Sequence, residues 1–97
     1  MYARVASWDG GEAEAMRSTV AGIRERTGEG PPEGVPAVGF LLLIDPENGK
    51  GMAVTLFETE AAMMEGDATL NTMSPPGDGM GTRSSVGFYE VGVDVRV

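Results

Sequence analysis

The side chains best suited to contact a small molecule are four in number: Arg4, Trp8, Asn71 and Tyr89. Trp8, the only tryptophan of the chain, can stack on an aromatic ligand, or it can close one end of the hydrophobic core. Tyr89 can orient a phenolic substrate through its hydroxyl group, or it can bury its ring and hydrogen-bond within the fold. Both aromatic side chains therefore have a structural interpretation beside the functional one.

The two polar candidates are also open to two interpretations. Arg4 belongs to a predicted strand, and an arginine is rarely buried without a partner. It can bind an anionic substrate, or it can form a salt bridge with Glu58 or Glu90. Asn71 follows a predicted helix, where it can hydrogen-bond a ligand or simply help to terminate the helix.

The chain contains neither histidine nor cysteine, and this restricts its chemistry. Without histidine it lacks the usual general base and the usual protein ligand of haem and zinc. Without cysteine, disulfides, thiolate metal sites and a cysteine nucleophile are excluded. We therefore expect no metal site and no cofactor, and the residues assign no catalytic group.

The net charge of the 97 residues is −8. Such acidity argues against partners that attract basic surfaces, namely nucleic acids and anionic membranes. The longest apolar run, residues 40–44, is too short to span a bilayer, and the sequence opens without a signal-peptide pattern. We expect a cytoplasmic protein, and the abundance of Ala, Gly and Val indicates a GC-rich bacterial genome.

The elements that position the candidates are organised around a β-hairpin within residues 34–60. Two apolar runs, residues 38–45 and 51–58, flank a turn containing the Asn-Gly pair that is typical of hairpins. Side chains alternate across a strand, so Leu41 and Leu43 point to one face while the even-numbered apolar residues point to the other. This strand is apolar on both sides and must be covered on both.

The first half of the chain contains a strand and an amphipathic helix. Residues 2–7 alternate as a short strand. Asp9 with Glu12 three residues later forms a capping-box pattern that predicts the start of a helix. Gly28 is the expected residue just beyond its end. The apolar residues of this helix recur at three- and four-residue spacing: Ala13, Met16, Val20 and Ile23.

The second half contains another helix and a last strand. Thr59 is the expected N-cap of a helix that runs to about Asn71. Residues 84–95 form the expected last strand, with Tyr89 on the same side as a row of valines. Several methionines can either fill the core or line an adaptable cavity. They are Met16, Met52, Met63, Met64 and Met73.

The order of elements predicts a single α+β domain over residues 1–97. Strand, helix, strand, strand, helix, strand is the ferredoxin-like βαββαβ pattern, in which two helices cover one face of a four-stranded antiparallel sheet. The other face would expose the second set of large apolar residues of the hairpin to water, a patch unusual in a monomer. We therefore expect a homodimer in which two copies pack through this sheet face.

The chain also resembles the antibiotic biosynthesis monooxygenase-like family of the dimeric α/β barrel superfamily. The likeness extends over most of the chain, although Phe57 and Thr59 stand where many members have Trp and Ser. The residues that carry it are Tyr2-Ala3-Arg4-Val5, Gly34, Gly39-Phe40, Leu42-Leu43-Ile44-Asp45, Gly49-Lys50, Thr55-Leu56-Phe57-Glu58-Thr59-Glu60 and Tyr89-Glu90-Val91.

The resemblance implies a dimer with a cavity between sheet and helices in each copy. Characterised enzymes of this group oxygenate aromatic polyketide-like compounds with molecular oxygen and without metal or flavin. The expected function is therefore the binding of an aromatic or apolar small molecule, with cofactor-independent monooxygenation as the expected reaction. The alternative is a dimeric binding or accessory module without catalysis. The resemblance assigns no catalytic residue.

Overall fold

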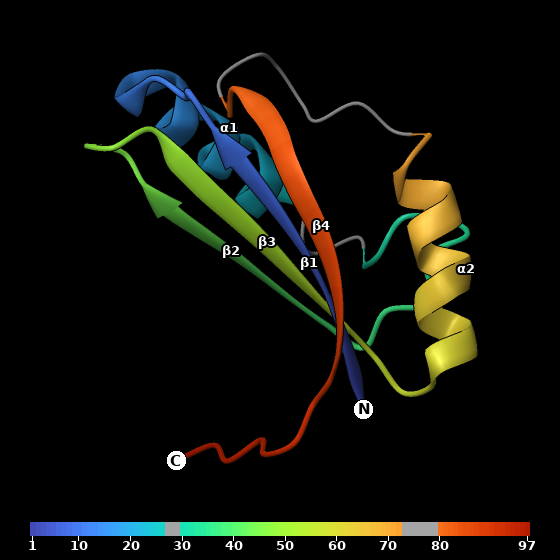
Figure 1. Ribbon diagram of the computed structural model, residues 1–97. Helices are drawn as coiled ribbons and strands as arrows, with labels where there is room; N and C mark the ends of the chain where they lie inside the picture. Colours follow the sequence, from blue (N-terminus) through green and yellow to red (C-terminus); the bar gives the residue numbers. More distant parts are fainter. Residues whose placement is uncertain (27–29, 73–79) are drawn as a thin grey trace.

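The computed structural model describes residues 1–26, 30–72 and 80–97, and it has the predicted order of elements (Figure 1). Gly28 and Met73, for which the sequence predicted a helix end and a core or cavity position, lie outside these residues. The elements are β1 (Tyr2–Asp9), α1 (Ala13–Arg26), β2 (Gly39–Asp45), β3 (Lys50–Phe57), α2 (Glu60–Leu70) and β4 (Thr82–Glu90).

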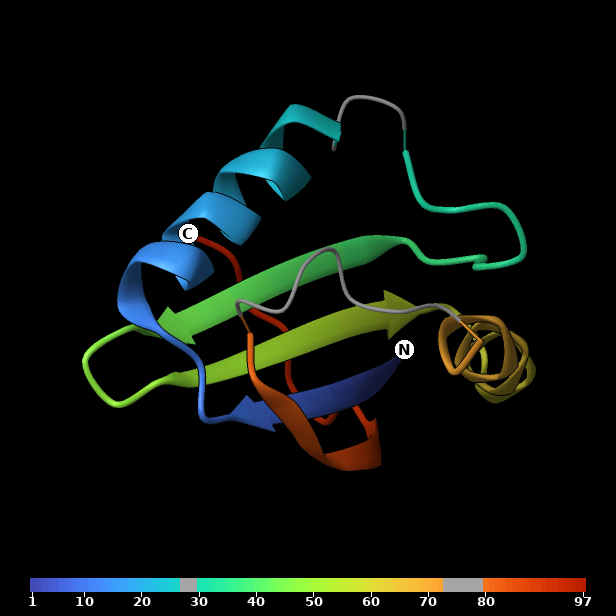
Figure 2. The same ribbon diagram turned by 90° about the horizontal axis from the view of Figure 1, so that it is seen from above.

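The four strands form one antiparallel sheet in the order β2-β3-β1-β4. Strands β1 and β3 are central, and β2 and β4 are the edges. In Figures 1 and 2, α1 runs alongside β2, whereas α2 stands near the end of the sheet where β3 ends. This is the ferredoxin-like βαββαβ arrangement, as predicted.

The two faces of the sheet follow from the register. Tyr2, Arg4, Ala6 and Trp8 of β1 lie opposite Phe57, Thr55, Ala53 and Gly51 of β3. Side chains of residues directly opposite each other lie on the same face of the sheet. These eight residues therefore share one face, from which Arg4 reaches Asp67 of α2. We call it the helix face. The other side, which contains Leu41, Leu43 and Tyr89, is called the open face because neither helix covers it.

The hairpin turn is stabilised by local hydrogen bonds. Asn48 Nδ2 donates to Asp45 Oδ2 over 2.8 Å. Gly49 follows with a φ of 66°, a left-handed conformation that favours glycine. Its carbonyl oxygen accepts a hydrogen bond of 2.9 Å from the backbone N–H of Gly11, which ties the hairpin tip to the start of α1.

The start of α1 differs from the predicted capping box. The first helical hydrogen bond runs from the Met16 N–H to the carbonyl oxygen of Glu12, so Glu12 occupies the N-cap position. Asp9 is instead the last residue of β1, where it pairs with Thr82, and its carboxylate accepts from the N–H of Gly10. The prediction was wrong because the sheet extends two residues further than the alternation indicated.

Helix α2 begins as predicted. The Thr59 hydroxyl oxygen accepts a hydrogen bond of 3.1 Å from the Ala62 N–H, and Asn71 is the C-cap. Phe57, which is fully buried, packs with Val35 and Met63 in a compact hydrophobic cluster. Gly66 permits this packing, since a methyl group there would meet the Phe57 ring at about 2.5 Å.

The last strand is shorter than predicted. β4 ends at Glu90, and the Val91 N–H still donates to the Met1 carbonyl oxygen over 2.9 Å. Residues 92–95, which the valine alternation placed in the strand, lie beyond the end of β1 and pair with none of the strands that the structure describes. In Figure 1 this segment runs clear of the sheet.

Candidate functional site

Three of the four predicted ligand-binding residues lie on the helix face. Arg4 and Trp8 point there from β1, and Asn71 follows the last turn of α2 above it. Tyr89 lies opposite Ala3 and therefore belongs to the open face. Its ring folds back over Gly87, where an added Cβ would meet it at about 2.8 Å. The structure thus separates Tyr89 from the other three.

Arg4 lies in a buried network beneath α2. Its side chain retains 5% of its accessible surface, and its Nε atom donates to Asp67 Oδ1 over 2.8 Å. Its Nη2 atom donates to Asn71 Oδ1 over 3.2 Å. The predicted partners Glu58 and Glu90 were wrong, because Arg4 extends away from the sheet towards α2, where Asp67 lies one turn before Asn71.

A β-bulge adds a second arginine that the sequence analysis missed. The register between β1 and β4 shifts between Ser7 and Trp8, so that Trp8 lies opposite Arg83. A bulge re-aims the side chains that follow it, and here it turns Arg83 towards the helix face. Arg83 Nη1 donates to Asn71 Oδ1 over 2.9 Å. No sequence signal marks this bulge.

Asn71 therefore links two cations through one oxygen. Asp67 neutralises Arg4, whereas Arg83 is exposed and forms no ion pair within the part of the chain that the structure describes. The cluster of Arg4, Asp67, Asn71 and Arg83 has a net charge of +1 in an otherwise acidic protein. Trp8, across the strand pair from Arg83, is partly buried.

Methionines fill the middle of the helix face. Met16 and Met80 are buried, and their terminal methyl groups lie over Gly51, where no side chain competes for the space. Ala6 and Ala53, the small residues beside them, are buried as well. The centre of this face is thus core, and no room for a ligand remains between Gly51 and these methionines.

An open groove remains at one edge of the helix face, between α1 and β2. Its volume is about 390 Å³. The backbone of α1 lies closest to β2, and the side chain of Phe40 is half exposed at the floor of the groove. The residues that line the groove are Val20, Ile23, Arg24, Phe40, Leu41 and Leu42.

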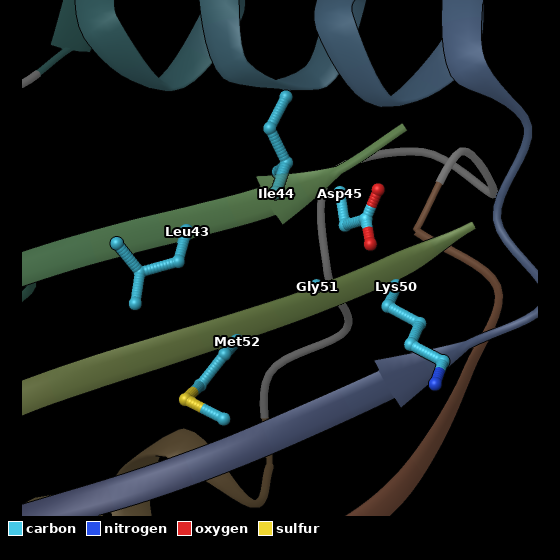
Figure 3. A pocket seen from close by; sticks show the side chains of 6 residues that line it. All are labelled: Leu43, Ile44, Asp45, Lys50, Gly51 and Met52. Carbon is cyan, nitrogen blue, oxygen red and sulfur yellow. The ribbon is translucent and has the colours of Figure 1, made fainter. Parts of the chain in front are cut away.

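A second, smaller hollow of about 220 Å³ lies at the tip of the hairpin (Figure 3). Leu43 and Met52 point to the same side, and Ile44 points towards α1. Asp45 and Lys50, which lie opposite each other at the end of the strand pair, complete the rim.

The groove is suited to binding more than to acid–base chemistry. Five of its six lining residues are apolar, so it offers a surface for an apolar or aromatic body. The remaining one, Arg24, is a permanent cation that can attract negative charge but cannot accept a proton. In the described part of the chain, no group of three acidic residues is arranged to hold a metal ion.

Comparisons with known proteins identify the fold. No protein-family model matches the chain, and no curated protein matches its sequence. The structure is similar to that of a candidate antibiotic biosynthesis monooxygenase from Deinococcus radiodurans, with a TM-score of 0.52 and 13% identity. The match covers 100% of this chain and 98% of that one.

The chain therefore has the fold of the antibiotic biosynthesis monooxygenase-like proteins, which confirms the predicted resemblance at the level of the fold. At this level of identity the likeness concerns the architecture alone. Among the residues described, no helix is both long and apolar enough to cross a membrane.

Proposed function

We propose that this protein is a homodimeric, small-molecule-binding member of the dimeric α/β barrels that acts in the bacterial cytoplasm. Its ligand is an apolar or aromatic compound held in the groove between α1 and β2, and its reaction is a monooxygenation without metal or flavin. The observation that carries the proposal is the groove, whose apolar lining and volume of about 390 Å³ suit a ligand of a few fused rings.

The dimer is supported by the open face. Leu41 is 55% exposed, Leu43 is 50% exposed and Tyr89 is 58% exposed, and all three belong to this one face. Val54 and Leu56 lie beside them on β3 and are only partly buried. A second copy packed sheet to sheet would remove this apolar surface from water, and each of these side chains would then lie in the interface.

The proposed reaction follows from what the groove contains. None of the groove residues can accept a proton from the substrate. The substrate must therefore bind as a phenolate that has already formed in water. This phenolate supplies the electrons that react with O2. With 1,8-dihydroxyanthrone as the probe, the central CH2 carbon would gain one oxygen atom of O2 as a carbonyl. Its two hydrogen atoms would leave with the second oxygen atom as water. The groove shields this step from solvent, and Arg24 stabilises negative charge.

The predicted ligand-binding residues take unequal parts in this proposal. Trp8 is separated from the groove by the methionines that lie over Gly51, so we assign it, beside Arg83, a structural part at the far side of the helix face. Arg4 and Asn71 position Arg83 rather than touch the ligand. Tyr89 is assigned to the interface between the two copies, because it lies on the open face.

Oxygen uptake with 1,8-dihydroxyanthrone tests the proposal. The wild-type chain should consume one O2 for each quinone formed, faster than the spontaneous oxidation. Val20→Trp places a large side chain in the groove and should abolish the enhancement. Ala21→Trp carries the same side chain on the exposed side of α1 and serves as the control. Equal rates for both variants would contradict the proposed site.

The second candidate is a dimeric binding or accessory module without catalysis. The absence of a proton acceptor among the groove residues favours it, since the chain then contributes only binding and exclusion of water. This candidate predicts saturable binding of polycyclic phenols with an oxidation rate equal to the spontaneous one. The same pair of variants distinguishes it, because Val20→Trp would weaken binding while no variant would change the rate.

A further inference from the structure

Helix α1 is the basic helix of an acidic protein, and it forms one wall of the ligand groove. The chain has a net charge of −8. Within Ala13–Arg26, three arginines are present with two glutamates, so α1 has a net charge of +1. Helix α2 has three acidic residues and no basic one. Three of the seven basic residues of the chain therefore belong to the helix that lines the groove.

The charges of α1 are sorted around the helix axis. Arg24 lines the groove, and Arg17 lies two turns earlier on the same side of the helix. At about 100° per residue, both arginines lie roughly 50–70° from the middle of the groove-lining side. Glu14 and Glu25 are exposed and lie roughly 130–150° from it. The rim of the groove on α1 is therefore cationic, and the acidic side chains of the helix are turned away.

The wall that β2 contributes to the groove is uncharged. Its three lining residues are apolar. Asp45, the only charged residue of β2, lies at the hairpin end of the strand, where it bonds to Asn48. The N–H of Gly11 ties the start of α1 to the same hairpin, so α1 and β2 run in opposite directions (Figure 2). Arg24, near the end of α1, therefore lies at the end of the groove away from Asp45.

We propose that the ligand of the groove is an aromatic acid, with its fused rings against the apolar wall and its carboxylate on Arg24. A planar guanidinium suits a carboxylate, because two parallel N–H···O bonds can form between them. A carboxylate is ionised at neutral pH, so it needs no proton acceptor from a groove that contains none. The inference rests on the proposed function and adds to it the class of substrate.

The local arginines outweigh the overall acidity of the chain at this site. Charges in water that are more than about 8 Å apart are largely screened at physiological salt. Arg17 and Arg24 are about 10 Å apart along the helix axis, so a carboxylate held by Arg24 on the side of Arg17 is attracted by both. The bound carboxylate occupies two of the five N–H donors of Arg24. The other donors stay available to the negative charge that develops in the reaction.

Titration with a matched pair of ligands tests the inference. Anthraquinone-2-carboxylate and anthraquinone-2-carboxamide share one ring system and nearly one shape, and only the first is charged. Binding is followed at the methyl signal of Ile23, which lines the groove. At low ionic strength the acid should bind about tenfold more tightly than the amide. In about 1 M NaCl, where the screening length is about 3 Å, this advantage should fall below about threefold.

Matched substitutions assign the effect to Arg24. Arg24→Gln should weaken binding of the acid by about five- to tenfold and leave binding of the amide within about twofold. Arg26→Gln removes the same charge from the same helix. The Nε atom of Arg26 donates to the carbonyl oxygen of Gly22, away from the groove, so this variant should change the affinity for the acid by less than about twofold. Retained binding of the amide shows that each variant is folded.

The outcomes distinguish this inference from the proposed function. Equal affinities for acid and amide, both with a shift at Ile23, would refute the acid class while leaving the groove as the binding site. Equal losses for Arg24→Gln and Arg26→Gln would refute the contact with Arg24. The absence of a saturable Ile23 shift with either ligand would refute the groove and the inference together.

Discussion

The Arg4–Asp67 ion pair offers a quantitative test of how α2 is fixed on the sheet. Asp67→Ala removes the carboxylate from an arginine whose side chain is 5% exposed, so a buried cation loses its counterion. Breaking such a pair typically costs about 3–5 kcal/mol. Asn71 Oδ1 would still accept from Arg4, and Asp67 itself is 16% exposed, so we expect the lower end, about 3 kcal/mol.

The assay is urea unfolding at one fixed protein concentration. With a slope of about 1.5 kcal/mol/M for a chain of this size, the midpoint should fall by about 2 M without a change in slope. Asp94→Ala is the matched control, because it removes the same group from the exposed pair with Arg96 and should change stability by less than about 0.5 kcal/mol. Equal small shifts for both variants would refute the buried network.

Further predictions concern the glycines of the helices and the open face. Gly66→Ala should destabilise the fold by about 1–3 kcal/mol in urea unfolding, because the new methyl group meets the Phe57 ring. Gly22→Ala, at an open position of α1, should stabilise it by about 0.5–1 kcal/mol, and a loss there would contradict the packing. Leu43→Lys should dissociate the proposed dimer in sedimentation, whereas Ala61→Lys on the exposed side of α2 should not.

The sequence allowed the architecture to be predicted because its signals are local. The hairpin was evident from an Asn-Gly turn between two apolar runs, and the structure has β2 and β3 on either side of that turn. Helix α2 begins and ends where Thr59 and Asn71 indicated, since capping depends on residues within one turn. The faces of β1 also follow from strict alternation.

The errors in the fold arose where tertiary pairing overrides a local pattern. Asp9 has the spacing of an N-cap, yet pairing with β4 keeps it in the sheet and moves the helix start to Glu12. The valine alternation after Glu90 is a genuine strand pattern, but β1 ends beside it and offers no further partner. A strand needs a neighbour, which one sequence does not reveal.

The candidate site was predictable only in part. Arg4 and Asn71 were chosen separately, and the structure joins them by a direct hydrogen bond between residues 67 positions apart. Arg83 was missed because a bulge sets its direction. The groove residues are ordinary apolar positions of α1 and β2, and only the loose packing of the helix on the strand makes them a site.

The most direct test of the proposed ligand site is an NMR titration with 1,8-dihydroxyanthrone on protein labelled at isoleucine and methionine methyl groups. Ile23 lines the groove, and Met52 lies on the opposite face of the sheet. A saturable shift of the Ile23 methyl signal, with Met52 unchanged, is the predicted result. A shift confined to Met52, or no saturable shift at Ile23, would contradict a ligand site between α1 and β2.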